Sequence, residues 1–224
     1  MFKSMKTGVL AAILISTALI ANAQKKVTEG TVNYEMKYYP TDGQEAIVAM
    51  LPTETASKFN STIFKFETQN GPAKTTFIQN YLTNTGIVLL DVPVAQWQYA
   101  IKVNKEAQDK EKAESPKFSG FKATGEKKVI ATYNAEKYTY TDDKGLNYEL
   151  WTTTDIEMPA GFYGTEFNDV KGALLIYTNY VRGVKTLNTF TKLKEEKVGD
   201  LTIEVPKGYT VKTMEEIMAM IPGQ

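Results

Sequence analysis

The chain contains no cysteine and no histidine among its 224 residues. Without cysteine it forms no disulfide, has no thiolate nucleophile and carries no iron–sulfur cluster. The absence of histidine removes the most common general base, the most common metal ligand and every catalytic arrangement that pairs histidine with serine or cysteine. The sequence also has no glycine-rich phosphate loop and no Gly-x-Ser-x-Gly turn. We therefore expect a protein that uses no metal or cofactor and is not an enzyme.

The charges of one sign are matched by those of the other, with 26 Lys and Arg against 26 Asp and Glu. A balanced charge argues against a nucleic-acid-binding protein, which usually presents a strongly basic face. With 42% hydrophobic and 23% charged residues the composition is that of a globular protein rather than a disordered chain.

The first residues have the three parts of a secretory signal peptide. Two lysines precede an apolar run at residues 9–20, and Ala21 and Ala23 supply the small residues before a cleavage site. The run is too short to span a membrane, which needs ~20 apolar residues. We expect residues 1–23 to be removed, leaving a single β-rich domain, residues 24–224, with no membrane span. In a bacterium with two membranes, this domain would be periplasmic or secreted.

The rest of the chain alternates mainly with a period of two, which is typical of strands. Strands with one wet and one dry face belong to antiparallel sheets, whereas runs that are apolar on both faces indicate covered central strands. Short turns rich in Gly, Asn and Asp separate them, so we expect about ten strands in one large sheet, curled or closed. The alternating segments are residues 32–38, 97–103, 138–140 and 201–205, and the apolar runs are residues 85–92 and 172–181.

Two short helices are expected outside the sheet. Residues 44–50 can form about two turns, and Thr213 with Glu216 fits a capping box at the start of a second helix near the C-terminus. Residues 104–114 carry charges of both signs and are expected to form a solvated loop or exposed helical turn. An apolar stripe at helical spacing predicts that the last helix packs on the sheet; its members are Met214, Ile217, Met218 and Ile221.

One acidic cluster leaves room for a carboxylate-based hydrolase, because glycoside chemistry needs two acids and no histidine. The cluster is better explained in part by a hairpin turn at residues 142–145. The hydrolase is therefore the third hypothesis, and it requires Asp142, Glu149 and Asp155 to share one cleft. The full cluster is Asp142, Asp143, Glu149, Asp155 and Glu157.

Three segments together resemble a secreted bacterial family known as domain of unknown function 4412. They are residues 125–138, which begin Gly-Glu-Lys-Lys, residues 149–156 with a Trp-Thr-Thr-Thr-Asp-Ile run, and residues 203–209 with Pro-Lys-Gly-Tyr. The chain departs from the family pattern at Thr132, where a glycine usually precedes the tyrosine, and at the charged segment of residues 104–119.

That family is in turn similar to the lipoprotein-carrier (LolA-like) superfamily. The resemblance implies a strongly curved antiparallel sheet, an unclosed barrel of about ten strands, with two or three short helices on its concave side. Such a fold can hold an acyl chain between sheet and helices. Likeness of fold raises an expectation but identifies no site.

We hypothesise a periplasmic or envelope-associated protein that sequesters a lipid, an acyl group or a similar hydrophobic molecule in an apolar cavity opened by displacement of a helix. The alternative is a non-catalytic module with a filled core that binds another envelope protein. We expect no nucleic-acid partner. Strand parity and helix spacing select the candidate cavity residues, which are Tyr34, Met36, Phe64, Phe66, Trp97, Tyr99, Tyr138, Trp151, Met214 and Met218.

Overall fold

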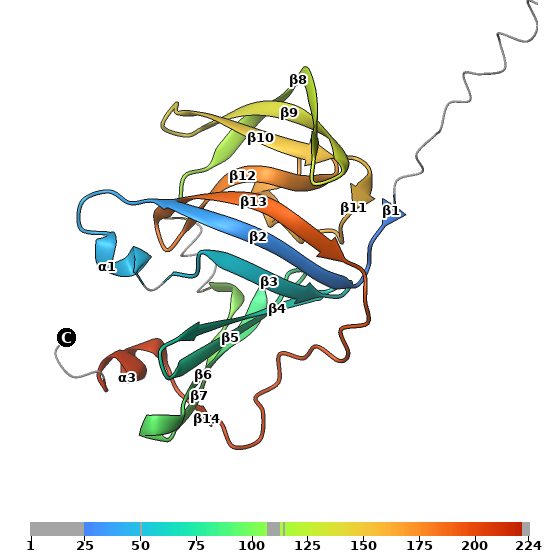
Figure 1. Cartoon of the computed structure of the whole chain (residues 1–224). Coiled ribbons are helices and arrows are strands. Elements are labelled where there is room, and N and C mark those ends of the chain that lie inside the picture. Colours follow the sequence, from blue (N-terminus) through green and yellow to red (C-terminus); the bar gives the residue numbers. More distant parts are fainter. Residues whose placement is uncertain (1–24, 50, 107–112, 114, 221–224) are drawn as a thin grey trace, which may run out of the picture.

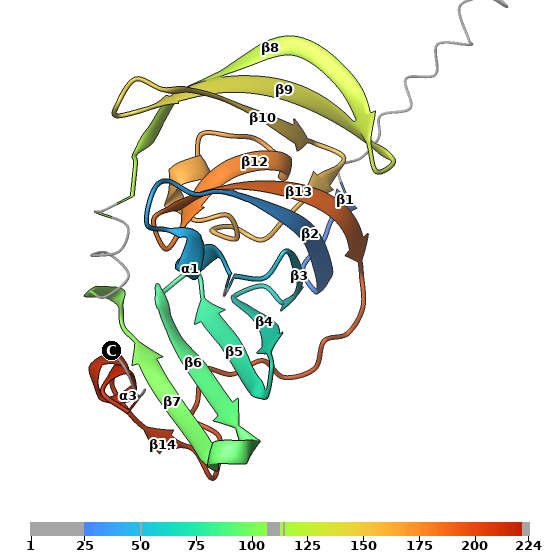
Figure 2. The same cartoon turned by 60° about the vertical axis from the view of Figure 1, so that its left-hand side comes forward.

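A computed structural model describes residues 25–49, 51–106, 113 and 115–220, apart from the side chain of Met218. The expected signal peptide and most of the charged segment at residues 104–114 lie outside these residues. Figures 1 and 2 show a large, bent sheet that makes up nearly all of the described chain. The prediction of a mainly β protein is confirmed.

Twelve strands form this sheet, in the order β14-β7-β6-β5-β4-β3-β2-β13-β12-β10-β9-β8. All neighbours are antiparallel except β14, which runs parallel to β7. The sheet is not closed, since β14 and β8 form its two edges, and it has twelve strands rather than about ten. Its strands are β2 (Gly30–Tyr39), β3 (Glu54–Phe59), β4 (Ile63–Asn70), β5 (Ala73–Asn80), β6 (Thr85–Val92), β7 (Trp97–Val103), β8 (Phe118–Ile130), β9 (Tyr133–Asp142), β10 (Asn147–Thr153), β12 (Ala173–Val181), β13 (Val184–Lys194) and β14 (Thr210–Val211).

The two strands at the middle of the sheet lie far apart in sequence. β2 pairs with β13 from Tyr39↔Lys185 to Thr31↔Lys194. A separate two-stranded parallel sheet joins β1 (Lys25–Lys26) to β11 (Ile156–Glu157). The N-terminal part of the domain is thereby fixed to two elements from the second half of the chain.

The strand predicted at residues 201–205 is not formed, and this prediction is wrong. The segment is irregular, but Ile203 and Val205 still pack against a cluster of sheet residues that includes Ile87. The alternation records burial against the face of the sheet, whereas strand pairing needs a free edge. The segment lies on a face of strands β4–β7 that are already paired with one another, so it has no ladder to join.

Two short helices whose bounds lie within the described residues are found outside the sheet. The helix α1 (Glu45–Val48) falls within the segment predicted at residues 44–50, of which residue 50 lies outside the described part. The helix α3 (Met214–Met218) begins at the predicted capping box. Its Glu216 N–H donates to the Thr213 hydroxyl at 3.1 Å, and the Thr213 N–H donates to the Glu216 carboxylate at 2.7 Å. Figure 2 shows α3 beside β14 and β7, at one edge of the sheet.

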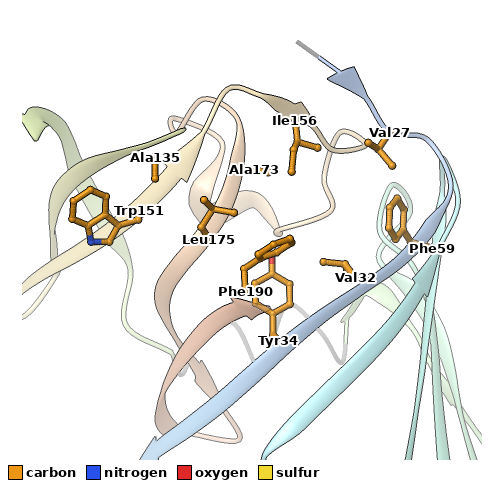
Figure 3. Close-up of a cluster of buried hydrophobic side chains, with 10 residues drawn as sticks. All are labelled: Val27, Val32, Tyr34, Phe59, Ala135, Trp151, Ile156, Ala173, Leu175 and Phe190. Carbon is orange, nitrogen blue, oxygen red and sulfur yellow. The ribbon is translucent and has the colours of Figure 1, made fainter. Parts of the chain in front are cut away.

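The loop between β11 and β12 fills part of the interior with aromatic side chains. Phe162 packs edge-on against Phe59, with ring centroids 5.2 Å apart, and Phe167 packs edge-on against Tyr177 at 5.4 Å. Only one turn of 3₁₀ helix, η2 (Thr165–Phe167), interrupts this loop. Figure 3 shows the neighbouring cluster, with Tyr34 and Phe190 between Trp151 at one end and Phe59 at the other. One half of the domain therefore has a packed aromatic core.

Candidate functional site

Strands β4–β7 carry a row of apolar side chains on one face of the sheet, called here the inner face. The row runs Phe66↔Phe77↔Val88↔Ile101, and directly paired residues point to the same side. The rings of Phe66 and Phe77 are stacked, with centroids 4.7 Å apart. Phe66, Phe77 and Val88 are nevertheless only half-buried. The centre of the inner face is therefore not covered by the rest of the described chain.

The apolar surface continues along the inner face toward the start of β7. Leu90 pairs with Tyr99, and Val92 pairs with Trp97, whose ring centroid lies 5.7 Å from that of Tyr99. All four side chains are half-buried. Aromatic and β-branched residues suit any strand, but such residues in a single-domain core are usually buried more completely.

The opposite, outer face of the same strands is sealed. Ile87 is 1% exposed and Ala100 is fully buried, and the segment that follows β13 packs over them through Ile203, Val205 and Tyr209. Figure 1 shows this segment passing along β4–β7 before it reaches β14. The two faces thus differ: C-terminal residues cover the outer face, and the described residues leave the inner face open.

A cavity of about 960 Å³ lies over the inner face. This volume is at the upper end of the ~300–1,000 Å³ range of small-molecule sites. Most of the apolar wall comes from β4–β7 and α3. The charged side chains come from the segment before β8, from η2 and from the β12–β13 turn, and these parts of the chain also contribute Phe118 and Tyr180. The lining residues are Phe64, Phe66, Phe77, Ile78, Gln79, Gly86, Ile87, Val88, Val103, Ala113, Ser115, Pro116, Lys117, Phe118, Thr165, Glu166, Asn179, Tyr180, Arg182 and Met214.

The inner face beyond β4 is occupied by the packed core. The Tyr34 hydroxyl donates to the Leu174 carbonyl at 2.8 Å and lies 3.1 Å from the Tyr163 hydroxyl. Burial raises the pKa of Tyr34 well above its usual value and raises that of Tyr163 to about 12. Both phenols stay protonated at ordinary pH and serve as hydrogen-bonding groups of the core.

Three of the ten candidate residues line the cavity: Phe64, Phe66 and Met214. Trp97 and Tyr99 lie on the same inner face, outside the lining of the cavity. Met214 is 45% exposed, so the expected packing of the α3 stripe on the sheet applies to Ile217, which is 4% exposed, and not to Met214.

The other candidates lie elsewhere. Tyr34 is in the packed core, and Trp151 is 7% exposed with the Lys128 ammonium 3.9 Å above its ring. Tyr138 packs against the second aromatic cluster, beside Leu150. Met36 is half-buried and accepts a 3.5 Å hydrogen bond from Tyr38 through its sulfur atom. The side chain of Met218 lies outside the described part of the chain. None of the four whose side chains are described lines the cavity.

Sequence reasoning missed Phe77, Val88, Val103 and Arg182 among the lining residues. The alternation within residues 73–80 could have placed Phe77 on one face. Only the register of β5 and β6 shows that this face is also that of Phe66. Nothing in the sequence indicates that the β12–β13 turn, which carries Arg182, reaches the same space.

The acidic residues of the hydrolase hypothesis each take part in a separate local interaction. Glu149 forms an ion pair with Lys137 at 2.8 Å, and Asp155 accepts a 2.8 Å hydrogen bond from the Asn134 N–H. Asp142 closes the predicted hairpin turn, accepting hydrogen bonds at 2.9 Å from Tyr148 and from two backbone N–H groups. Burial alone would raise the pKa of Asp142, but these hydrogen bonds lower it on balance.

Within the described ranges, no group of three or more acidic side chains could hold a metal ion. No helix of the described chain is long and apolar enough to cross a membrane. No protein-family model matches the sequence, and neither does any curated protein. The cavity and the open inner face are the features of the described chain that bear on function.

Proposed function

We propose that this protein is an exported bacterial envelope protein that binds a lipid, an acyl chain or a similar hydrophobic molecule, without catalysis. The binding site is the cavity over the inner face of β4–β7. The proposal includes cleavage of residues 1–23 and the likeness of the fold to lipoprotein carriers.

The observation that carries this proposal is the difference between the two faces of β4–β7. The outer face is sealed by the chain, whereas Phe66, Phe77 and Val88 stay half-exposed beside a cavity of about 960 Å³. Leaving apolar area in contact with water costs free energy that a ligand can recover, at ~0.8 kcal/mol for each methylene group buried. An apolar ligand would cover the apolar side chains that the described residues leave half-exposed.

The short helix α3 is the element best placed to regulate access. It has five residues, its Met214 lines the cavity, and its capping box fixes only its first turn. A helix this short depends on tertiary contacts for its stability. Displacing α3 would widen the cavity without breaking the ladders of β4–β7.

The experiment is native mass spectrometry of the protein purified without detergent from a periplasmic fraction, followed by solvent extraction and lipid analysis. We expect the mass of residues 24–224 plus a stoichiometric adduct that extraction removes. If the mass is bare, dodecanol and phospholipids are added to the purified protein, and uptake is measured.

A pair of matched variants tests where the ligand sits. Val88→Phe adds a ring at the half-buried centre of the cavity wall and should reduce uptake at least tenfold. Val94→Phe makes the same change at a site that is 79% exposed and outside the cavity, and should leave uptake unchanged. Circular dichroism melts check that both variants fold. Equal uptake by the two folded variants would overturn the assignment of the cavity.

A module that binds another envelope protein is the second candidate. It is favoured by the packed aromatic core around Tyr34 and Phe190, which fills the rest of the inner face. If neither an adduct nor uptake of added lipid is found, affinity capture from the envelope fraction with wild-type protein and Val88→Phe becomes the deciding measurement.

A further inference from the structure

The wall of the cavity is divided by chemistry. Strands β4–β6 supply the apolar side chains of Phe66, Phe77 and Val88. The basic side chains of the same wall are those of Lys117 and Arg182. Lys117 precedes β8, and Arg182 lies in the turn between β12 and β13. Both side chains are exposed, so both are available to a ligand from solution.

Arg182 is the only arginine of the chain; the other 25 basic residues are lysines. The backbone conformation at Arg182 is unfavourable for a residue with a side chain. Arg182 and Gly183 have φ of 49° and 73°, between the paired residues Val181 and Val184. Two-residue turns with both φ values positive prefer Asn-Gly. The turn at Ala131 and Thr132 is also unfavourable, with φ of 47° and 87°, so conformation alone does not single out Arg182. What distinguishes Arg182 is that it lines the cavity.

The guanidinium of Arg182 forms no ion pair and no side-chain hydrogen bond with another described residue. The same holds for the ammonium of Lys117, whose backbone N–H alone is engaged, by Asp143 at 3.3 Å. One acid, Glu166, lines the same cavity. Among the described residues, the cavity wall therefore carries two positive charges and one negative charge, next to an apolar surface.

We propose that the ligand is an amphiphile with an anionic head, a phosphate or a carboxylate, held by Arg182 and Lys117 while its chain lies over Phe66, Phe77 and Val88. This inference rests on the proposed function and specifies its ligand class. Arginine suits the role because its planar fork of N–H donors matches both carboxylate and phosphate oxygens, in two parallel hydrogen bonds. Lysine adds a point charge without that directional requirement.

The test compares three probes by isothermal titration below their aggregation concentrations: dodecyl phosphate, dodecanol and inorganic phosphate. The first two share a chain and differ only in the head, and the third is the head alone. We expect dodecyl phosphate to bind about tenfold more tightly than dodecanol, the size of effect that charge-assisted hydrogen bonds give near a protein surface. Inorganic phosphate should bind far more weakly than either.

Variants assign the preference to the two basic residues. The double variant Arg182→Gln/Lys117→Gln should bind dodecyl phosphate no better than dodecanol. The matched control Lys207→Gln removes one exposed positive charge away from the cavity and should keep the tenfold preference. Arg182→Lys keeps the charge but not the fork, so it should lose part of the preference. Glu166→Gln should strengthen dodecyl phosphate binding about twofold relative to dodecanol binding.

The outcomes separate this inference from the proposed function. Equal binding of dodecyl phosphate and dodecanol, or a preference that survives the double variant, overturns the anionic-head site and leaves the apolar site standing. Tight binding of inorganic phosphate alone overturns the amphiphile. Failure of both chain probes, with the protein folded, overturns the proposed function and this inference together.

Discussion

Replacing Phe162 with alanine tests whether the loop between β11 and β12 acts as a plug that holds the two halves of the sheet. The ring packs edge-on against Phe59 at 5.2 Å, Tyr81 at 6.0 Å and Phe64 at 6.3 Å. Truncating a fully buried phenylalanine costs about 3–5 kcal/mol, and each aromatic pair adds ~0.5–1.5 kcal/mol beyond the area buried. Because Phe162 is half-buried, we expect a loss of about 2–3 kcal/mol.

The measurement is urea unfolding followed by tryptophan fluorescence, with a thermal melt as a second probe. At ~2–4 °C per kcal/mol for a domain of this size, Tm should fall by roughly 4–12 °C. Val94→Ala, at a position that is 79% exposed, is the control and should change the free energy of unfolding by less than ~0.5 kcal/mol. A loss of under ~1 kcal/mol in Phe162→Ala would refute the reasoning, since it would mean that the loop is not part of the cooperative core.

Three further predictions follow from local geometry. Gly172→Ala should destabilise the domain strongly, because its Cβ would lie 2.0 Å from the Thr153 carbonyl oxygen, whereas Gly125→Ala, with nothing within 4 Å, should cost only ~1–2 kcal/mol for its positive φ; paired urea titrations compare them. Thr132→Gly should raise stability by about 0.5–1 kcal/mol in the same assay, because glycine relieves a φ of 87° at a β-branched residue, less its own entropy cost. For Asp142, the folded pKa lies below the usual 3.8, so its stabilisation is present above that pH and is lost as the pH falls through the lowered pKa. Acid titration followed by near-UV circular dichroism should therefore show a smaller dependence on pH below 4 in Asp142→Asn; an unchanged profile would contradict the assignment.

Local signals in the sequence predicted some of the elements. The apolar run at residues 85–92 matches β6, and the alternation at residues 97–103 matches β7. The capping box at Thr213 is formed as predicted. These features depend on a few consecutive residues, whose turn chemistry and period of two are visible without knowledge of the fold.

The composition of the cavity could not be predicted in the same way. Phe66 and Trp151 have similar apolar surroundings in sequence, yet one lines the cavity and the other lies in the packed core. The difference depends on which face the loop with Phe162 covers and which face Ile203 seals, and both are contacts between distant segments. The same segment around Ile203 alternates like a strand but only packs on one, because periodicity records burial and not pairing.

The pairing of β2 with β13 determines when, during synthesis of the chain, the sheet can form. Residues 30–39 emerge early in synthesis, but their partners at residues 185–194 come almost at the end. Contacts between residues this far apart in sequence form slowly, because the chain loses entropy on closing a long loop before the contacts contribute any stabilisation. When β2–β7 have been synthesised, β13, the partner strand of β2, has not yet been made. Ile203 and Val205, which cover the outer face, are also still missing. The nascent chain therefore stays incompletely folded until nearly all of it has been made.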